Sequence, residues 1–306
     1  MTAAPPTAGA HDGPAAPLSA GAALRALLAR DEPLVAPGAT SALLAKLIAE
    51  AGFAAVYLTG AGVSHAFLGE PDLGLTTLTE CAAMVESLAA ATPLPVIADA
   101  DTGFGGVLNV QRAVRLYESR GAGAIQIEDQ VFPKRCGHFD GKEIVPVPEM
   151  LARIRAALDA RREMLVIART DARTVAGLDE AIERGRAYAA AGADVVFVES
   201  PLTVEELERI GAELGPRVPL LANMVEGGKT PLLSADELYG LGYRIVIFPG
   251  LLTRITVRAV QEALAVLRAA GDSRPLLPRA ASFDEISGVV GLAARDALAR
   301  RLELGE

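Results

Sequence analysis

Cysteine, histidine and aromatic residues are scarce in this chain. Its 306 residues include two Cys, three His and no Trp. Cys81 and Cys136 lie too far apart in the sequence to suggest a disulfide framework. A chain of this length can bury a sizeable core, so it needs neither a disulfide nor a zinc ion in order to fold. With two thiols and no export signal, the sequence predicts a reducing, cytoplasmic location.

An excess of positive charge is also missing, and so are long apolar runs. The net charge of −9 argues against nucleic acid or an anionic membrane as a partner, because phosphate binding requires clustered positive charge. No stretch of about 18 uninterrupted apolar residues is present, so no membrane span is predicted. Residues 1–17 are rich in Ala, Pro and Gly and lack the basic start and apolar centre of a signal peptide. We therefore predict a disordered tail over residues 1–17 and a single domain over residues 18–306.

What the chain does have is a regular alternation of strand-like and helix-like segments. The predicted strands are eight short apolar or β-branched runs: Leu34–Gly38, Ala54–Thr59, Val96–Asp101, Ala124–Asp129, Leu165–Thr170, Val195–Glu199, Leu220–Met224 and Ile245–Pro249. Segments with apolar residues three and four apart lie between them: Thr40–Ala51, Val107–Arg120, Pro148–Arg161, Leu178–Ala191, Val204–Leu214 and Ala235–Leu241. Glycine-containing turns at residues 51–53, 121–123 and 191–193 each end a helix before the next strand.

Such an alternation predicts parallel strands joined by right-handed crossovers. Eight units at this length favour a closed (β/α)₈ barrel, the TIM barrel of the α/β class. The alternative is an open doubly wound sheet, which usually carries a glycine-rich phosphate loop after its first strand; residues 37–40 match that loop poorly. Two more helical segments, Thr253–Ala269 and Ser282–Leu302, follow the eighth strand. We expect them to form either a capping helix pair or a helix that is exchanged between subunits.

Polar residues gather where the predicted strands end. Barrel enzymes build their active sites at the C-terminal ends of the strands, so these residues define a candidate site. They are Tyr57, Thr59, Gly60, Asp99, Asp101, Thr102, Gln126, Glu128, Asp129, Arg169, Thr170, Asp171, Glu199, Asn223 and Glu226.

Carboxylates dominate this ring of residues. Asp99 and Asp101 are two apart in a predicted strand and are therefore expected to point the same way. Buried carboxylates repel one another unless a cation is present. Oxygen ligands without a histidine cluster favour Mg²⁺ or Mn²⁺ over zinc, so the acids at 99, 101 and 128 predict a Mg²⁺ site, with Mn²⁺ as the alternative. Asp171 is instead expected to cap the helix that follows it.

The segment Lys134–His138 places Cys136 among basic residues. Neighbouring positive charge lowers the pKa of a thiol from its ordinary value of about 8.5. The glycines at 137 and 141 would let this loop move over a reaction that must exclude water. An inert thiol in a basic surface loop is the alternative, which a place at the mouth of the barrel disfavours. Cys81 is expected in the core, and His65 in a lid or on the surface.

Several segments together resemble the isocitrate lyase/phosphoenolpyruvate mutase superfamily. They are Pro71–Gly74, Asp99–Gly105, Ile127–Gln130, Lys134–His138, Ala168–Asp171 and Asn223–Pro231. The resemblance runs from residue 20 to residue 300. It implies a TIM barrel that breaks a carbon–carbon bond in a small 2-hydroxy or 2-oxo carboxylic acid. It also implies a homotetramer with an exchanged C-terminal helix, for which Ser282–Leu302 is the candidate.

The resemblance further implies a role for each site residue. Mg²⁺ would be held by Asp99, with the other acids acting largely through water; the predicted metal residues are Asp72, Asp99, Asp101 and Glu128. The residues expected to bind substrate are Tyr57, Thr59, Gly60, Ala61, Asp72, Gly137, His138, Arg169, Glu199 and Asn223. Those expected to be catalytic are Tyr57, Glu128, Cys136 and Arg169. Arg169 would stabilise oxyanion charge, and Cys136 would be the general acid that protonates the departing enolate.

Three positions depart from the usual pattern of methylisocitrate lyases. Gln126 stands in place of His, Val225 in place of a polar residue, and Leu251 lies where Pro-Leu-Ser is more usual. These changes remove polar groups and predict a smaller or more alkyl-substituted substrate, such as a 2-alkylmalate, over a methylisocitrate-type tricarboxylate. Two other superfamily activities stay open, a carboxyphosphonoenolpyruvate-type phosphonomutase and an oxaloacetate decarboxylase or hydrolase. A barrel that binds a metabolite without catalysis is a further alternative, which the intact set of acids, Arg and Cys disfavours.

Overall fold

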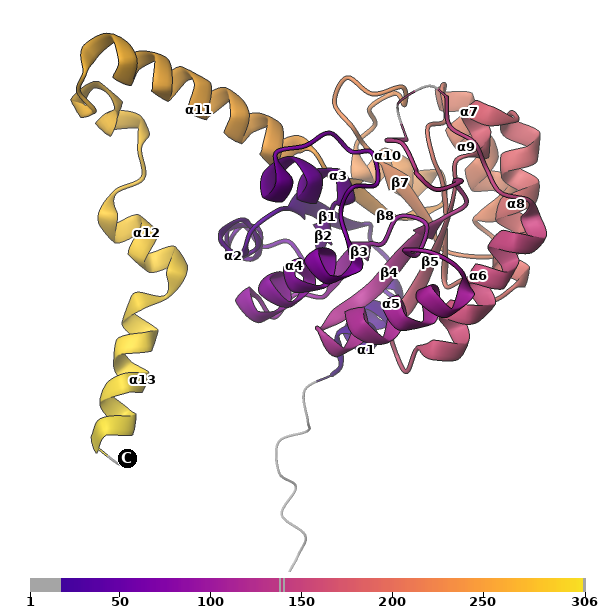
Figure 1. The fold of residues 1–306 in the computed structure, drawn as a ribbon, viewed down its shortest axis with the longest axis horizontal. Helices are drawn as coiled ribbons and strands as arrows, with labels where there is room; N and C mark the ends of the chain where they lie inside the picture. Colours follow the sequence, from indigo (N-terminus) through magenta and orange to yellow (C-terminus); the bar gives the residue numbers. More distant parts are fainter. Residues whose placement is uncertain (1–17, 138, 140, 305–306) are drawn as a thin grey trace, which may run out of the picture.

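The computed structural model describes residues 18–137, 139 and 141–304, and within these ranges the chain forms the predicted closed barrel (Figure 1). Neighbouring strands are parallel and pair in sequence order, and the eighth closes on the first with Leu34 opposite Ile245. The strands are β1 (Leu34–Ala39), β2 (Val56–Leu58), β3 (Val96–Asp99), β4 (Ala122–Glu128), β5 (Leu165–Thr170), β6 (Val195–Val198), β7 (Leu220–Asn223) and β8 (Tyr243–Phe248). The predicted disordered tail, residues 1–17, lies outside the described residues.

Helices cover the outside of this barrel (Figure 1). They are α2 (Ala42–Glu50), α4 (Leu78–Ala91), α5 (Val107–Ser119), α6 (Val147–Ala160), α8 (Leu178–Ala190), α9 (Val204–Leu214) and α10 (Ala235–Gly240), with the short α3 (Gly60–Val63) and α7 (Ala172–Val175) after β2 and β5. A short π-helix, Ser64–Leu68, follows α3 directly. Capping boxes at Thr77 and Ser234 satisfy the first N–H groups of α4 and α10. None of the described helices has both the length and the apolar character needed to cross a membrane.

The inside of the barrel is packed with side chains and is no channel. Strand residues such as Ile97, Ile167 and Phe197 are fully buried there. Leu24 from α1 (Ala20–Leu28) is also fully buried in this inner cluster. A second core lies between the strands and the surrounding helices. This filled interior leaves space for a ligand only beyond the strand ends, which is the usual arrangement of a TIM barrel.

Strand β3 ends two residues earlier than predicted. Asp101 has φ +48°, a left-handed conformation that is incompatible with a strand, so β3 stops at Asp99. Asp99 and Asp101 therefore do not share a strand, which corrects the predicted strand end. Their carboxylates nevertheless reach the same place, because a Cβ at Gly60 would lie 2.8 Å from Asp99 Oδ2 and 3.2 Å from Asp101 Oδ1.

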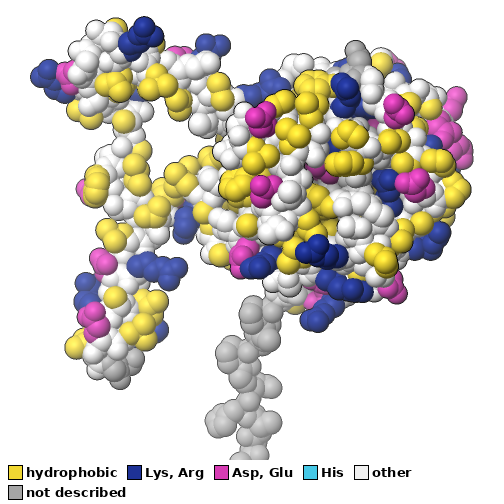
Figure 2. Space-filling model, in the orientation of Figure 1, with side chains coloured by type: hydrophobic (Ala, Val, Ile, Leu, Met, Phe, Trp, Pro, Cys, Tyr) yellow, Lys and Arg dark blue, Asp and Glu magenta, His cyan; other side chains and the backbone are white. Residues whose placement is uncertain are grey.

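The C-terminal helices do not cap the barrel. Helix α11 (Leu251–Ala270) leaves the barrel mouth and is followed by a 3₁₀ turn (Arg274–Arg279), α12 (Phe283–Val290) and α13 (Leu292–Leu304), which form an arm beside it (Figure 1). The predicted single helix over Ser282–Leu302 is broken at Gly291, whose φ is +78°. No residue of α11, α12 or α13 is buried, and hydrophobic side chains lie along the arm (Figure 2). Phe283 is 87% exposed.

Candidate active site

A cavity of about 420 Å³ opens at the carboxyl ends of the strands. Most of the residues predicted to form the site line it, namely Tyr57, Thr59, Ala61, Asp72, Asp99, Glu128, Cys136, Gly137, Arg169, Glu199 and Asn223. Gly60 and Asp101 do not line the cavity but lie directly behind Asp99. His138 lies outside the described residues.

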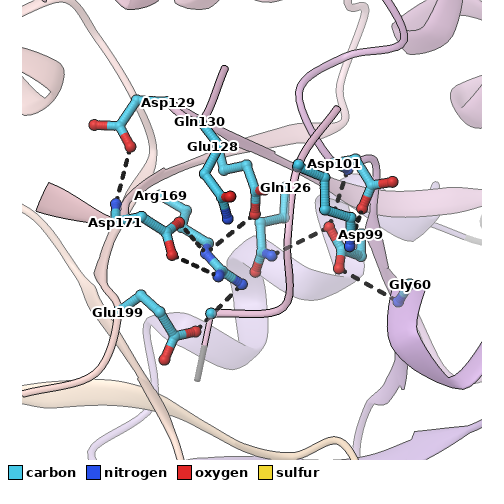
Figure 3. Close-up of polar contacts among 12 residues, drawn as sticks. Gly60, Asp99, Asp101, Gln126, Glu128, Asp129, Gln130, Arg169, Asp171 and Glu199 are labelled. Carbon is cyan, nitrogen blue, oxygen red and sulfur yellow. Dashed lines mark hydrogen bonds and ion pairs between the residues drawn. The ribbon is translucent and has the colours of Figure 1, made fainter. Parts of the chain in front are cut away.

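Asp99 is held by three donors at the end of β3 (Figure 3). Its Oδ1 accepts the Asp101 N–H at 3.1 Å and the Gln126 amide at 3.3 Å, and its Oδ2 accepts the Gly60 N–H at 3.3 Å. A Cβ at position 60 would lie 2.8 Å from Asp99 Oδ2, so only glycine allows this approach. The carboxylate is thus fixed in direction, with one edge left facing the cavity.

Lys134 neutralises the two acids beside Asp99. Its buried Nζ lies 2.9 Å from Asp101 Oδ1 and also contacts the carboxylate of Asp72. Burial raises the pKa of Asp101 to about 6, with Lys134 opposing that shift and Asp99 adding to it. The sequence predicts Lys134 only as a positively charged neighbour of the Cys136 thiol. Its ion pair with Asp72 could not be predicted, because the two residues are 62 positions apart in the sequence.

Arg169, at the end of β5, connects three carboxylates. Its Nε and Nη2 donate to Asp171 at 2.9 and 3.0 Å, its Nε lies 3.2 Å from Glu128, and its Nη1 lies 3.2 Å from Glu199 (Figure 3). The guanidinium also stacks over the ring of Phe197 at 5.1 Å. Burial raises the pKa of Glu128 although Arg169 opposes the shift. These contacts aim a rigid cation at the cavity.

Two polar pairs complete the walls. Tyr57 donates to the Gln126 side chain at 3.1 Å, and burial keeps the pKa of Tyr57 well above its ordinary value, so the phenol stays protonated. Asn223 donates to Glu199 at 3.1 Å. Gln126 is fully buried between Tyr57 and Asp99 and does not line the cavity. Gln in place of His at position 126 therefore affects the support of Tyr57 and Asp99. It does not change a group that a ligand in the cavity would contact.

The Cys136 loop is anchored on both sides of the thiol. The Gln130 side chain accepts the Arg135 N–H at 3.0 Å and donates to the Arg135 carbonyl at 2.9 Å. Gly137 packs so closely that an added Cβ would lie 2.5 Å from Arg169 Nη2 and 2.7 Å from Glu199. Half-buried Cys136 thus faces the same cavity as Asp99 and Arg169. Gln130 lies in the Ile127–Gln130 segment that carries the family resemblance, but nothing in the sequence indicates that it braces this loop.

Two expectations about individual residues were wrong. The Asp171 side chain makes no capping hydrogen bond to α7; it accepts from Arg169 and Lys142. Two buried cations compete more strongly for this carboxylate than the helix N–H groups do. Leu251 does not line the cavity, whose apolar lining comes instead from Val225, Ile247 and Pro249 and from Val257 of α11. Cys81 lies in the core and His65 is exposed at the cavity, as expected.

The donor set fits a hard divalent cation. Asp99 and Glu128 face the cavity with oxygen donors only, and Glu128 Oε1 is buried without a hydrogen-bond partner. Within the described residues no three acidic, Cys or His side chains converge closely enough to hold an ion alone. Mg²⁺ suits such a site because it retains several waters and typically takes only one or two carboxylates from the protein.

A TIM barrel with an acid cluster, a buried arginine and a cysteine at its mouth defines a class of small-molecule enzyme. The family model of phosphoenolpyruvate phosphomutase matches residues 24–268. The chain therefore belongs to this family, within the isocitrate lyase/phosphoenolpyruvate mutase superfamily as predicted.

Relatives of known activity agree with this assignment. The chain is 46% identical over 277 residues to 2,3-dimethylmalate lyase of Eubacterium barkeri, covering 90% of this chain and 95% of the relative. It is 42% identical over 271 residues to 2-methylisocitrate lyase of Aeropyrum pernix, covering 89% and 87%. The prediction of a carbon–carbon lyase enzyme is confirmed at this level.

A solved structure gives a further comparison. The crystal structure of phosphonopyruvate hydrolase in complex with oxalate and Mg²⁺ matches this fold with a TM-score of 0.82 and 33% identity, covering 93% of this chain and 99% of that one. That enzyme binds a two-carboxylate ligand together with the metal.

Proposed function

We propose that this protein is a Mg²⁺-dependent lyase that cleaves the carbon–carbon bond of a 2-alkylmalate. The observation that supports this most directly is the convergence of Asp99, Arg169 and Cys136 on one cavity. The reaction needs an anchor for the 2-hydroxy acid, a fixed cation for the developing negative charge and a proton donor for the leaving carbon. Each of the three side chains supplies one of these requirements.

The proposed reaction balances within the site. The substrate hydroxyl loses its proton, its C–O bond becomes a carbonyl, and the adjacent C–C bond breaks with its electrons moving into the departing carboxylate. Glu128 takes the hydroxyl proton, since it faces the cavity beside Arg169, whose Nε lies 3.2 Å from its carboxylate. Arg169 stabilises the enolate, and the Cys136 thiol delivers a proton to its carbon. Mg²⁺ bound at Asp99 would supply Lewis acidity and orient the 2-hydroxy acid end.

The proposed substrate is small and alkyl-substituted. The lining of the cavity includes the apolar residues Val225, Ile247 and Val257, which suit alkyl groups. The volume of about 420 Å³ is at the low end for ligand pockets. Of the three positions that predict this substrate, Val225 lines the cavity, whereas Gln126 and Leu251 do not.

A substrate panel tests this proposal. The purified protein is incubated with Mg²⁺ and with 2-alkylmalates, 2-methylisocitrate, isocitrate or oxaloacetate, and 2-oxo acid products are measured by mass spectrometry. We expect fastest release of a 2-oxo acid from a 2-alkylmalate, with loss of turnover after EDTA and recovery when Mg²⁺ or Mn²⁺ is returned. Faster cleavage of 2-methylisocitrate would refute the substrate assignment, and turnover that survives EDTA would refute the metal.

The remaining activities are separate outcomes of the same panel. Release of oxalate or carbon dioxide from oxaloacetate identifies a hydrolase or decarboxylase. A new P–C signal in ³¹P NMR with carboxyphosphonate substrates identifies a phosphonomutase. No turnover together with retained binding of oxalate identifies a barrel that binds without reacting. The cytoplasmic location and the single domain over residues 18–306 stay predictions, which the substrate panel does not test.

We further propose that the C-terminal arm is exchanged between subunits of a homotetramer. Its exposed apolar residues include Ile255, Leu264, Phe283 and Ile286, which in a monomer would all face water. Light scattering of the full chain is expected to give a tetramer, and a chain ending at Gly271, where α11 ends, is expected to give smaller species. A full chain that is monomeric at micromolar concentration would contradict exchange.

A further inference from the structure

Lys142 is a buried cation with two functional neighbours. It lies between the Cys136 loop and α6, and its side chain is 1% exposed. Its Nζ donates to Asp171 Oδ1 at 2.8 Å and to the Gly137 carbonyl at 2.5 Å. A buried ammonium is costly unless it is paired and hydrogen-bonded, so these two acceptors fix where the Lys142 side chain lies.

The contact with Asp171 connects Lys142 to Arg169. Asp171 accepts Lys142 on Oδ1 and Arg169 on both oxygens, and its own N–H donates to Asp129 Oδ1 at 2.9 Å. Asp129 is in turn bonded by Tyr188 at 2.8 Å and by Arg184 at 3.1 Å. Burial alone would raise the pKa of Asp171, but Arg169 and Lys142 hold it below its ordinary value. Asp171 is thus a fixed anion between two cations.

The contact with the Gly137 carbonyl connects Lys142 to the backbone beside the Cys136 thiol. Gly137 follows Cys136 directly and packs against Arg169 and Glu199. Its carbonyl accepts Lys142 at 2.5 Å and the hydroxyl of Ser200 at 3.3 Å. One ammonium therefore joins the backbone next to Cys136 to the carboxylate that orients Arg169.

We propose that Lys142 is a positioning residue that sets the placement of the Cys136 thiol relative to the Arg169 guanidinium. Cleavage needs the charge-stabilising cation and the proton donor at defined places around one enolate. Without the ammonium, the partners that remain among the described residues are Ser200, at a longer distance, for the Gly137 carbonyl and Arg169 for the Asp171 carboxylate. The catalytic meaning of this role rests on the proposed lyase function, but the placement of the thiol can be measured without any substrate.

The test compares Lys142→Met with the parent chain and with Lys46→Met, the same change at a half-buried lysine of α2 that does not line the cavity. Cys136 alkylation by iodoacetamide is followed by peptide mass spectrometry at fixed pH. Cys81 is the internal reference for unfolding, because it is 3% exposed and burial raises its pKa to about 12. We expect Lys142→Met to change the Cys136 alkylation rate at least tenfold with Cys81 unlabelled, while Lys46→Met leaves that rate unchanged. With an active substrate, kcat falls more than KM rises.

A second variant separates positioning from charge. Lys142→Met leaves one more uncompensated negative charge, whereas Lys142→Met combined with Asp171→Asn restores the original charge balance but still lacks the donor to Gly137. The proposal requires the changed Cys136 alkylation rate to persist in the double variant.

Three results would overturn the proposal. They are a Cys136 rate in Lys142→Met within twofold of the parent chain, a return to the parent rate in the double variant, and rapid Cys81 labelling in both variants. The last would make Lys142 a folding residue only. Absence of turnover on the substrate panel would overturn the proposed function but would leave the alkylation result to decide on Lys142.

Discussion

Replacement of Arg169 by Gln is expected to lower kcat/KM by about 10²–10³-fold, the cost typical of removing a main oxyanion donor. The guanidinium is buried and held by Asp171, Glu128 and Glu199, so its orientation is set before substrate arrives. Gln can reach fewer of these partners and carries no charge. Arg169→Lys keeps the charge but loses the planar fork, and we expect it to recover only a small part of the activity. Steady-state kinetics with the best substrate of the panel measures both variants.

The matched control for Arg169 is Arg173. Arg173 pairs with Glu206 through a similar two-pronged contact, but it does not line the cavity. Arg173→Gln should therefore change kcat/KM less than about threefold, as expected for a partly exposed ion pair away from the chemistry. Thermal unfolding of both variants shows whether the loss in Arg169→Gln reflects instability. If Arg169→Gln and Arg173→Gln lose activity equally, Arg169 has no special role in the reaction.

The barrel could be predicted from the sequence because its signals are local. Runs of buried β-branched residues, amphipathic helical spacing and glycine turns each lie within a few residues, and their alternation alone predicts the parallel closed sheet. Helices α1 and α4 were not among the predicted segments. Ala and Leu recur throughout α1, with Leu24 buried in the barrel interior and Arg25 exposed, so no wide polar face marks its register.

The site residues could also be predicted, because polar side chains at strand ends are unexpected unless they have a function. Their partners could not. Asp171 has the sequence position of a helix cap, and only the fold brings Lys142, 29 residues away, to its carboxylate. Lys134 likewise pairs with Asp72, which lies 62 positions away in the sequence. The turn at Asp101 depends on a left-handed backbone at a non-glycine residue, which spacing does not reveal.

Cys136→Ser is expected to lower kcat by about 10²–10⁴-fold with little change in KM, the range typical of losing a general acid. The serine hydroxyl is close to the thiol in size but far less acidic, so the enolate would form and not be protonated efficiently. The loop should keep its place, since Gln130 and Lys142 bind its backbone and not the thiol. Turnover of a malate that carries alkyl groups on both C2 and C3 adds a second readout in D₂O, because its released carbon becomes a stereocentre when it takes up deuterium. The parent enzyme should place deuterium on one face of that carbon, and the variant on both.

The second cysteine provides the control for this variant. Cys81 is a buried core thiol that does not line the cavity, so Cys81→Ala should lower stability slightly and leave kcat nearly unchanged. Retention of more than a tenth of the parent kcat in Cys136→Ser, with deuterium still on one face, would mean that another group delivers the proton. Tyr57 would then be the residue to change next, because it lines the same cavity and burial keeps its phenol protonated. If instead both readouts change as expected, the proton donor and the carbon it protonates are identified together.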